Sequence, residues 1–201
     1  MAGLRQYELA EASEARAVEL AEKYQFPDLA AMSRCILGHM RAILGRATEG
    51  IGLIGQGAAE LLKVGARLGS TSSYPTYLAV ALERKGAIDE ALETIEQALQ
   101  GGSGVLYYRP ESLRIRGELR IRHAEPKLAE VDFRDSIAMA RTMSAKAWEL
   151  RATMSLARLL RDTGRRDQAR TMLAEIYNWF TEGFDTLDLI DAKALLDELS
   201  N

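Results

Sequence analysis

The feature that most constrains this chain is a set of small residues that recurs at intervals close to 40. A second small set stands twelve positions earlier, and a third stands seven positions later. A long period with fixed offsets predicts stacked helix pairs, because small residues let two helix backbones approach closely. The sets are Ala10, Gly50, Ala91, Ala129 and Ala169; Gly38, Ala79, Gly117 and Ala157; and Ala17, Gly57, Ala98 and Ser136, with Ile176 in the last place.

Prolines and glycines divide the chain into expected helices. All four prolines precede stretches with helical periodicity, where the missing N–H has no intrahelical partner to lose. Glycines mark the expected helix ends at positions 69, 86, 101, 164 and 183. We predict an all-α, right-handed α-solenoid of antiparallel helix pairs, a superhelix of about ten helices. The expected helices are 3–24, 27–45, 48–68, 74–85, 88–100, 109–123, 126–143, 145–163, 166–181 and 186–199.

The repeat register also predicts a single domain over residues 1–201. Ala10 and Ala17 keep the register of second helices, so residues 1–25 are expected to be a second helix without its first. Residues 184–201 are expected to form the polar-faced capping helix that such arrays need. Four helix pairs are expected between them, over residues 26–70, 71–104, 105–144 and 145–183.

Composition narrows the function classes. One cysteine and two histidines exclude an internal disulfide and leave few ligands for zinc. The apolar runs are too short to span a membrane, and no apolar signal core precedes Glu14, so a cytoplasmic location is expected. The net charge is −3, made up of −3 over residues 1–102, +6 over 103–170 and −6 over 171–201. A mildly acidic chain of this kind is not expected to bind nucleic acid.

The spacing of Ala79, Ala91, Ile95 and Ala98 resembles the tetratricopeptide repeat. The resemblance implies a non-catalytic module that binds a protein or a peptide. The repeats here are longer than usual, and the aromatic residue expected early in the first helix is missing. The equivalent sets are Gly38, Gly50, Ile54 and Gly57; Gly117, Ala129, Phe133 and Ser136; and Ala157, Ala169 and Leu173, where Ile176 departs from the pattern.

A narrower resemblance concerns the end of the chain. Residues 177–186, followed by Asp188-Leu189 and Ala192-Lys193, resemble the C-terminal tail of large bacterial signalling proteins. Those proteins carry a class III adenylate/guanylate cyclase or DNA-binding domain, then a STAND-type ATPase module, then a long tetratricopeptide array. The resemblance implies that this chain is the array part, with a regulatory role in signal transduction. No cyclase or ATPase motif is present in the sequence itself.

In the tetratricopeptide family the first helix of each pair lines a concave groove. Transferring its groove-facing positions predicts a groove that is apolar at its start and arginine-rich at its end. Arginines there would suit an acidic peptide or protein segment. The alternatives are a solvated helix face, or pairing with the chain's own acidic end at residues 185–198. The candidate groove residues are Cys35, His39, Thr76, Val80, Arg84, Arg114, Glu118, Arg122, Met154, Arg158 and Arg161.

Other patterns carry less weight. Gly50, Gly52 and Gly55 spell GxGxxG, but they lie inside an expected helix, so nucleotide binding or an enzymatic role is a minor alternative. Cys35 and His39 lie one helical turn apart without further metal ligands. No nucleophile and base converge, so no catalytic residue, metal or cofactor is expected. The main alternative function is self-association through the exposed face of helix 3–24, which would give a homodimer.

Overall fold

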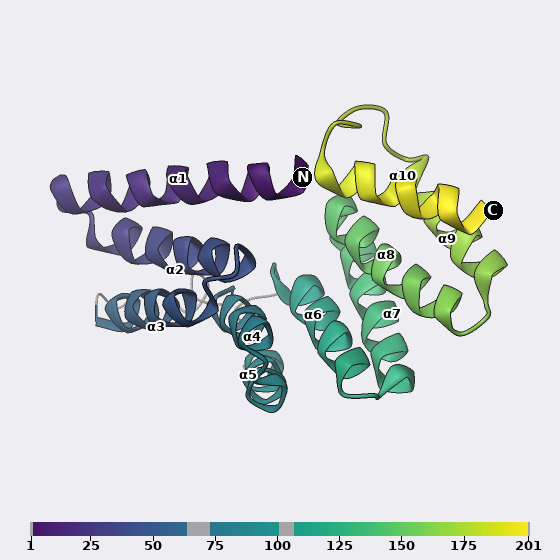
Figure 1. Ribbon diagram of the computed structural model, residues 1–201, viewed down its shortest axis with the longest axis horizontal. Helices are drawn as coiled ribbons and strands as arrows, with labels where there is room; N and C mark the ends of the chain where they lie inside the picture. Colours follow the sequence, from purple (N-terminus) through teal and green to yellow (C-terminus); the bar gives the residue numbers. More distant parts are fainter. Residues whose placement is uncertain (1, 64–72, 101–106, 201) are drawn as a thin grey trace. The chain divides into compact units, whose positions relative to one another are not determined.

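The computed structural model describes residues 2–63, 73–100 and 107–200, with side chains from residue 5 onward (Figure 1). Within these ranges the chain forms ten α-helices and no β-strand, which confirms the predicted all-α fold. The helices are α1 (Ala2–Lys23), α2 (Pro27–Ile43), α3 (Ala47–Lys63), α4 (Tyr74–Lys85), α5 (Ile88–Gln100), α6 (Arg109–Arg122), α7 (Pro126–Thr142), α8 (Lys146–Asp162), α9 (Arg166–Tyr177) and α10 (Leu187–Ser200).

The helices fall into two compact units, Met1–Tyr108 and Arg109–Asn201. In the first unit, α2 packs against α1, α3 and α4, and α4 also packs against α3 and α5. In the second unit, each helix from α6 to α10 packs against the next, and α8 also contacts α6 and α10. Within each unit, therefore, consecutive helices form pairs and the first helices of successive pairs contact each other.

Six turns between consecutive helices share the Schellman hydrogen-bond pattern. In the turn after α4, for example, the Ala87 amide donates to the Leu82 carbonyl and the Gly86 amide donates to the Glu83 carbonyl, both at 3.0 Å. The pattern needs one residue with positive φ, which explains the glycine expected at this place. The residues in that conformation are Gln25, Gly45, Gly86, Ala124, Ser144 and Gly164. The predicted ends at positions 69 and 101 lie outside the described residues.

Three of these six turns place a residue other than glycine in the left-handed conformation. Ala124 has φ 61° and is exposed, so its Cβ strains the backbone without packing against the core. We expect Ala124→Gly to raise the free energy of unfolding by about 1 kcal/mol, because glycine adopts this conformation freely. Urea unfolding checks this. Ala138→Gly, at an exposed position inside α7, is the matched control and should destabilise the protein by about 1 kcal/mol.

The small residues of α2 and α3 bring two backbones into direct contact. A Cβ added to Gly50 would lie 2.4 Å from the Gly38 carbonyl oxygen, and one added to Gly38 would lie 2.6 Å from the Gly50 carbonyl oxygen. A Cβ on Gly57 would lie 2.5 Å from both the Ala31 carbonyl oxygen and the Cys35 sulfur. These glycines therefore lie where the backbones of α2 and α3 touch, and α3 runs through Gly50 and Gly57 as one helix.

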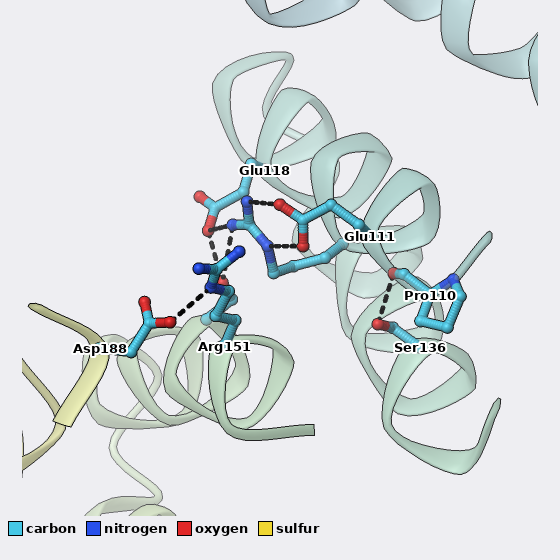
Figure 2. A network of polar contacts seen from close by, with 8 residues as sticks. Pro110, Glu111, Glu118, Ser136, Arg151 and Asp188 are labelled. Carbon is cyan, nitrogen blue, oxygen red and sulfur yellow. Dashed lines mark hydrogen bonds and ion pairs between the residues drawn. The ribbon is translucent and has the colours of Figure 1, made fainter. Parts of the chain in front are cut away.

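The pair α6–α7 uses the same positions differently. A Cβ on Gly117 would meet the ring of Phe133 at 2.4 Å, so this glycine makes room for an aromatic side chain. Ser136 occupies the place of Gly57, and its hydroxyl donates a 2.6 Å hydrogen bond to the Pro110 carbonyl (Figure 2). A serine fits there because its buried hydroxyl bonds the carbonyl of the first helix.

Most of the alanines at the other packing positions are also buried. Ala79, Ala91, Ala129, Ala157 and Ala169 are buried, whereas Ala98 is half-buried. Helix α10 packs against α8 and α9 through buried leucines and Ala192, so it covers the last helix pair. Its buried side chains are Leu189, Ala192, Leu195 and Leu199.

Two helices were expected to extend beyond the bounds given above. Residues 64–68 of the helix expected at 48–68 lie outside the described residues. The helix expected at 166–181 ends earlier, at Tyr177. The amides of Trp179 and Phe180 donate to the carbonyls of Ile176 and Tyr177, three positions back, so the α-helical ladder stops and the chain turns away.

Candidate protein-interaction surfaces

Three of the eleven candidate groove residues lie in the interior. Cys35 and Thr76 are buried in the first unit and Met154 is buried in the second, so the groove prediction is wrong for these side chains. Transferring positions from a related repeat assumes a fixed rotation of each helix about its axis. Here the neighbouring helices cover these positions, and the side chains serve the core instead.

Cys35 illustrates this interior role. Its thiol lies 3.6 Å from the Ile54 carbonyl oxygen on α3, beside Gly57. Burial raises the pKa of the thiol to about 12, so the reactive thiolate does not form near neutral pH. Among the described residues, no group of three or more His, Cys, Asp or Glu side chains could hold a metal ion. None of the described helices is long and apolar enough to cross a lipid bilayer.

In the first unit, the candidate His39 on α2 belongs to an aromatic stack that also includes Tyr77 and Tyr108. The His39 and Tyr77 rings stack with centroids 4.5 Å apart, and Tyr108 meets Tyr77 edge-on at 5.7 Å. All three side chains are half-buried, so each keeps part of its surface open to solvent. Neither tyrosine is among the predicted groove residues. Their only signal is the tyrosine-rich composition around positions 74–77 and 107–108.

The other two candidates in this unit lie further along α4. Val80 is half-buried, one residue after the packing position Ala79, and Arg84 is exposed in the last turn. The Arg84 guanidinium lies 3.6 Å from the carboxylate of Glu83, its chain neighbour. Arg84 is thus the one arginine among the candidate groove residues of the first unit.

In the second unit, the candidates Arg114 and Glu118 belong to a polar network between α6 and α8 (Figure 2). Arg114 donates two hydrogen bonds to Glu111, at 2.7 and 2.9 Å, and also bonds Glu118. Ser155 on α8 donates to Glu118 at 2.6 Å. On the same helix, Arg151 donates to Asp188 at the start of α10 at 2.8 Å. Arg114 and Arg151 are therefore paired with carboxylates of the chain itself.

The chain's acidic end engages the next arginines. Arg161 bonds Glu198 at 2.9 and 3.0 Å and Asp162 at 2.8 Å. Arg166 donates to the carbonyls of Glu198 and Leu199, where the last turn of α10 carries partial negative charge. The pairing of arginines with residues 185–198, one of the alternatives predicted from sequence, is thus what the structure contains. Of the candidates, Arg158 is exposed and forms no ion pair with another described residue, and Arg122 is also exposed.

A buried ionic cluster between α6 and α7 has no counterpart in the sequence prediction. Asp132 is fully buried and accepts hydrogen bonds from Arg116 at 2.6 and 3.1 Å and from Arg120 at 2.8 Å. Helix α6 carries five arginines among 14 residues and has few apolar side chains to hold it in place. The cluster therefore adds charged hydrogen bonds between α6 and α7 to the contact of Gly117 with Phe133.

A second carboxylate makes stability depend on pH. Glu130 on α7 accepts hydrogen bonds from Arg165 at 2.7 and 3.0 Å and from Arg134 at 2.7 Å. The Arg165 guanidinium chiefly, against the raising effect of burial and with help from Arg134, lowers the pKa of Glu130 from 4.5 to about 2. Because the pKa is lower in the folded state, ionised Glu130 stabilises the fold above the unfolded pKa, and this contribution is lost as the pH falls toward 2.

We therefore expect Glu130→Gln to be less stable than the wild type at neutral pH, with a difference that shrinks as the pH falls from about 5 to 2. Urea unfolding at a series of pH values measures this. Arg165→Ala should flatten the pH dependence of the wild type, because it removes the principal cause of the shift. A difference that stays constant across this range would contradict the assignment.

Comparison with known proteins places the fold. No protein-family model and no curated protein matches the chain. Among solved structures, BtubC (BKLC) from P. vanneervenii is similar, with a TM-score of 0.75 and 17% identity over 96% of this chain and 82% of that one. Two structures of a Podosopora anserina kinesin light chain-like protein with TPR-like repeats each give a TM-score of 0.62 and 18% identity, covering 83% of both chains. The chain therefore has the tetratricopeptide-like helical-repeat fold.

Proposed function

We propose that this protein is a non-catalytic protein-interaction module. The observation that carries the proposal is the half-buried aromatic stack of His39, Tyr77 and Tyr108 in the first unit. Aromatic side chains are enriched at the energetic centres of protein interfaces, because they bury much area at little cost in conformational entropy. A partner segment lying across the stack would cover the ring surfaces that the monomer leaves open.

The aromatic stack is a better-supported binding surface than the arginine-rich end of the predicted groove. That end is called the arginine wall below and consists of Arg114, Arg158 and Arg161. Arg114 and Arg161 already bond carboxylates of the chain, so an acidic partner would have to displace those pairs. Arg158 remains available as a single cation. An acidic partner therefore gains less there than the count of arginines in the sequence suggests.

The test is selection of binding peptides from a displayed library, followed by titration against variants. His39→Ala and Tyr108→Ala should each weaken the selected peptides about tenfold or more, as expected at interface centres. Tyr24→Ala, at an exposed tyrosine after α1, is the matched control and should leave binding unchanged. Equal binding by the wild type and both stack variants would reject this surface. An Arg114/Arg158/Arg161→Ala variant tests the arginine wall in the same assay.

Self-association is a second candidate, favoured by the outer face of α1. Leu9 and Leu20 are exposed on this helix and lie within about 20° of each other around its axis. Light scattering over a concentration series should show a dimer if this face pairs with a second copy, and Leu9→Asp/Leu20→Asp should abolish it. Leu62→Asp, at an exposed position on α3, is the control. A wild type that stays monomeric would remove this candidate.

The wider context is proposed on the tail resemblance alone. Residues 177–186 resemble the end of arrays in bacterial cyclase and ATPase signalling proteins, so the module would regulate such a protein. Sequencing the complete reading frame tests this, because a cyclase or ATPase domain in the same frame is the expected finding. A frame that encodes neither domain would reject it.

A further inference from the structure

Figure 1 shows the segment that joins α9 to α10. This segment holds two aromatic side chains outside the core. Tyr177 and Phe180 pack against the core of the second unit and fix the segment in place. The Trp179 ring meets the Phe180 ring edge-on, with centroids 5.2 Å apart, and the Phe184 and Tyr177 ring centroids are 5.8 Å apart. Trp179 nevertheless remains 57% exposed and Phe184 48% exposed.

Backbone contacts order the segment near Phe184. Gly183 has φ 76°, and its carbonyl accepts hydrogen bonds from both the amide and the hydroxyl of Thr186, at 2.9 and 2.7 Å. The two exposed rings are therefore presented from a structured turn. A preformed aromatic surface loses less conformational entropy when a partner binds.

Two exposed carboxylates stand on either side of Phe184 in the chain. Glu182 and Asp185 flank Phe184, are exposed, and form no ion pair with another described residue. A partner that covers Phe184 meets these two carboxylates, which favours a positively charged partner over an anionic lipid surface or a nucleic acid.

The indole ring already binds a cation within the chain. The Lys146 ammonium lies 5.5 Å from the Trp179 ring centroid and is also held by Glu149 at 2.7 Å. This contact shows that the π system of Trp179 is accessible to a positive charge. With this contact in place, Trp179 is still 57% exposed.

We propose that Trp179, Phe184, Glu182 and Asp185 form a docking surface for an arginine-containing segment of a protein partner. A guanidinium stacks flat on an indole ring and donates paired hydrogen bonds to a carboxylate, which a lysine ammonium does less well. Apolar side chains next to the arginine would cover Phe184. This surface gives the proposed interaction module a partner chemistry, and it rests on that function, but it is separate from the aromatic stack of the first unit.

The probe is a labelled synthetic peptide with alternating arginine, leucine and serine, titrated by fluorescence anisotropy. Matched peptides carry lysine or glutamate in place of arginine. We expect the arginine peptide to bind about tenfold or more tightly than the glutamate peptide, and more tightly than the lysine peptide. Its affinity should fall as salt is added, because exposed carboxylates contribute to it.

Trp179→Ala and Phe184→Ala should each weaken the arginine peptide several-fold, and Glu182→Gln/Asp185→Asn should reduce its salt dependence. Both rings are on the surface, so circular dichroism should show unchanged folding. Leu128→Ala, at a leucine 47% exposed on α7, is the control for loss of an exposed apolar side chain. Equal affinity for the arginine and glutamate peptides, or wild-type affinity in Trp179→Ala, would overturn the proposal.

The proposed binding at the aromatic stack and the proposed docking surface at Trp179 can be rejected independently of each other. His39→Ala should leave binding of the arginine peptide unchanged, whereas it should weaken library peptides that use the aromatic stack. If the arginine peptide binds and His39→Ala weakens it as strongly as Trp179→Ala does, the docking surface assigned here is wrong while the interaction module stands. If His39→Ala and Tyr108→Ala weaken nothing but Trp179→Ala does, the aromatic stack is rejected and this surface is retained.

Discussion

Replacing Asp132 with asparagine is expected to lower the free energy of unfolding by about 3–5 kcal/mol, the usual cost of breaking a buried ion pair from one side. The carboxylate is fully buried and bonded to Arg116 and Arg120, whose side chains are only 20% and 14% exposed. Asparagine keeps the shape but removes the charge, so two guanidinium groups lose their counter-charge in a poorly solvated place. Urea or thermal unfolding of the purified variant measures the loss.

Asp135→Asn provides the control for this substitution. Asp135 is exposed on the same helix and forms no ion pair with another described residue, so its replacement should change stability by less than about 0.5 kcal/mol. Arg116→Met/Arg120→Met/Asp132→Leu tests the cluster as a whole, since replacing every charge by apolar groups is often tolerated. Similar losses for Asp132→Asn and Asp135→Asn would show that the buried cluster does not hold α6 in place.

Gly50→Ala is expected to destabilise the protein by about 1–3 kcal/mol, the cost of overpacking a filled interior. The added methyl group would lie 2.4 Å from the Gly38 carbonyl oxygen and 3.0 Å from the Ala42 Cβ. Both are atoms of a neighbouring helix that cannot rotate away, so α2 and α3 must separate. Gly38→Ala should behave alike, because its Cβ would lie 2.6 Å from the Gly50 carbonyl oxygen.

The same helix supplies the matched controls. Gly52 and Gly55 are exposed on α3, and a Cβ added at either position meets no atom within 4 Å. Gly52→Ala and Gly55→Ala should each stabilise the protein by about 0.5–1 kcal/mol, because alanine favours the helix more than glycine. A loss of stability in Gly50→Ala together with a gain in Gly52→Ala would confirm that the contact between α2 and α3, and not helix propensity, requires a glycine at position 50. Equal stabilisation at both positions would contradict the packing model.

The helices were the most predictable part of the structure. Pro27 and Pro126 begin α2 and α7 as expected, and Gly86 and Gly164 close α4 and α8 with positive φ. These are local preferences of the backbone, which a sequence carries residue by residue. The Schellman turns at Gln25, Ala124 and Ser144 could not be predicted in this way, because packing of the flanking helices overrides the local cost there.

The interaction surfaces were predictable only in part. Groove positions were assigned from repeat register, and the structure buries Cys35, Thr76 and Met154 while leaving His39 and Arg158 partly or fully open. Register gives the position of a residue along a helix, but burial depends on which neighbours pack against it. Tyr108 reaches Tyr77 across a distance in sequence that no helical pattern connects.

The sequence by itself determined the repeat, since Gly38, Gly50 and their equivalents require helices that touch at fixed intervals. Only the tertiary structure decided how the charges are used. Arg116 meets Asp132 across 16 residues, and Arg151 meets Asp188 across 37. Among the candidate groove arginines, Arg114 and Arg161 are bonded to carboxylates of the chain itself. Helix formation follows from local backbone energetics, whereas the partner of a long charged side chain depends on which helices pack side by side.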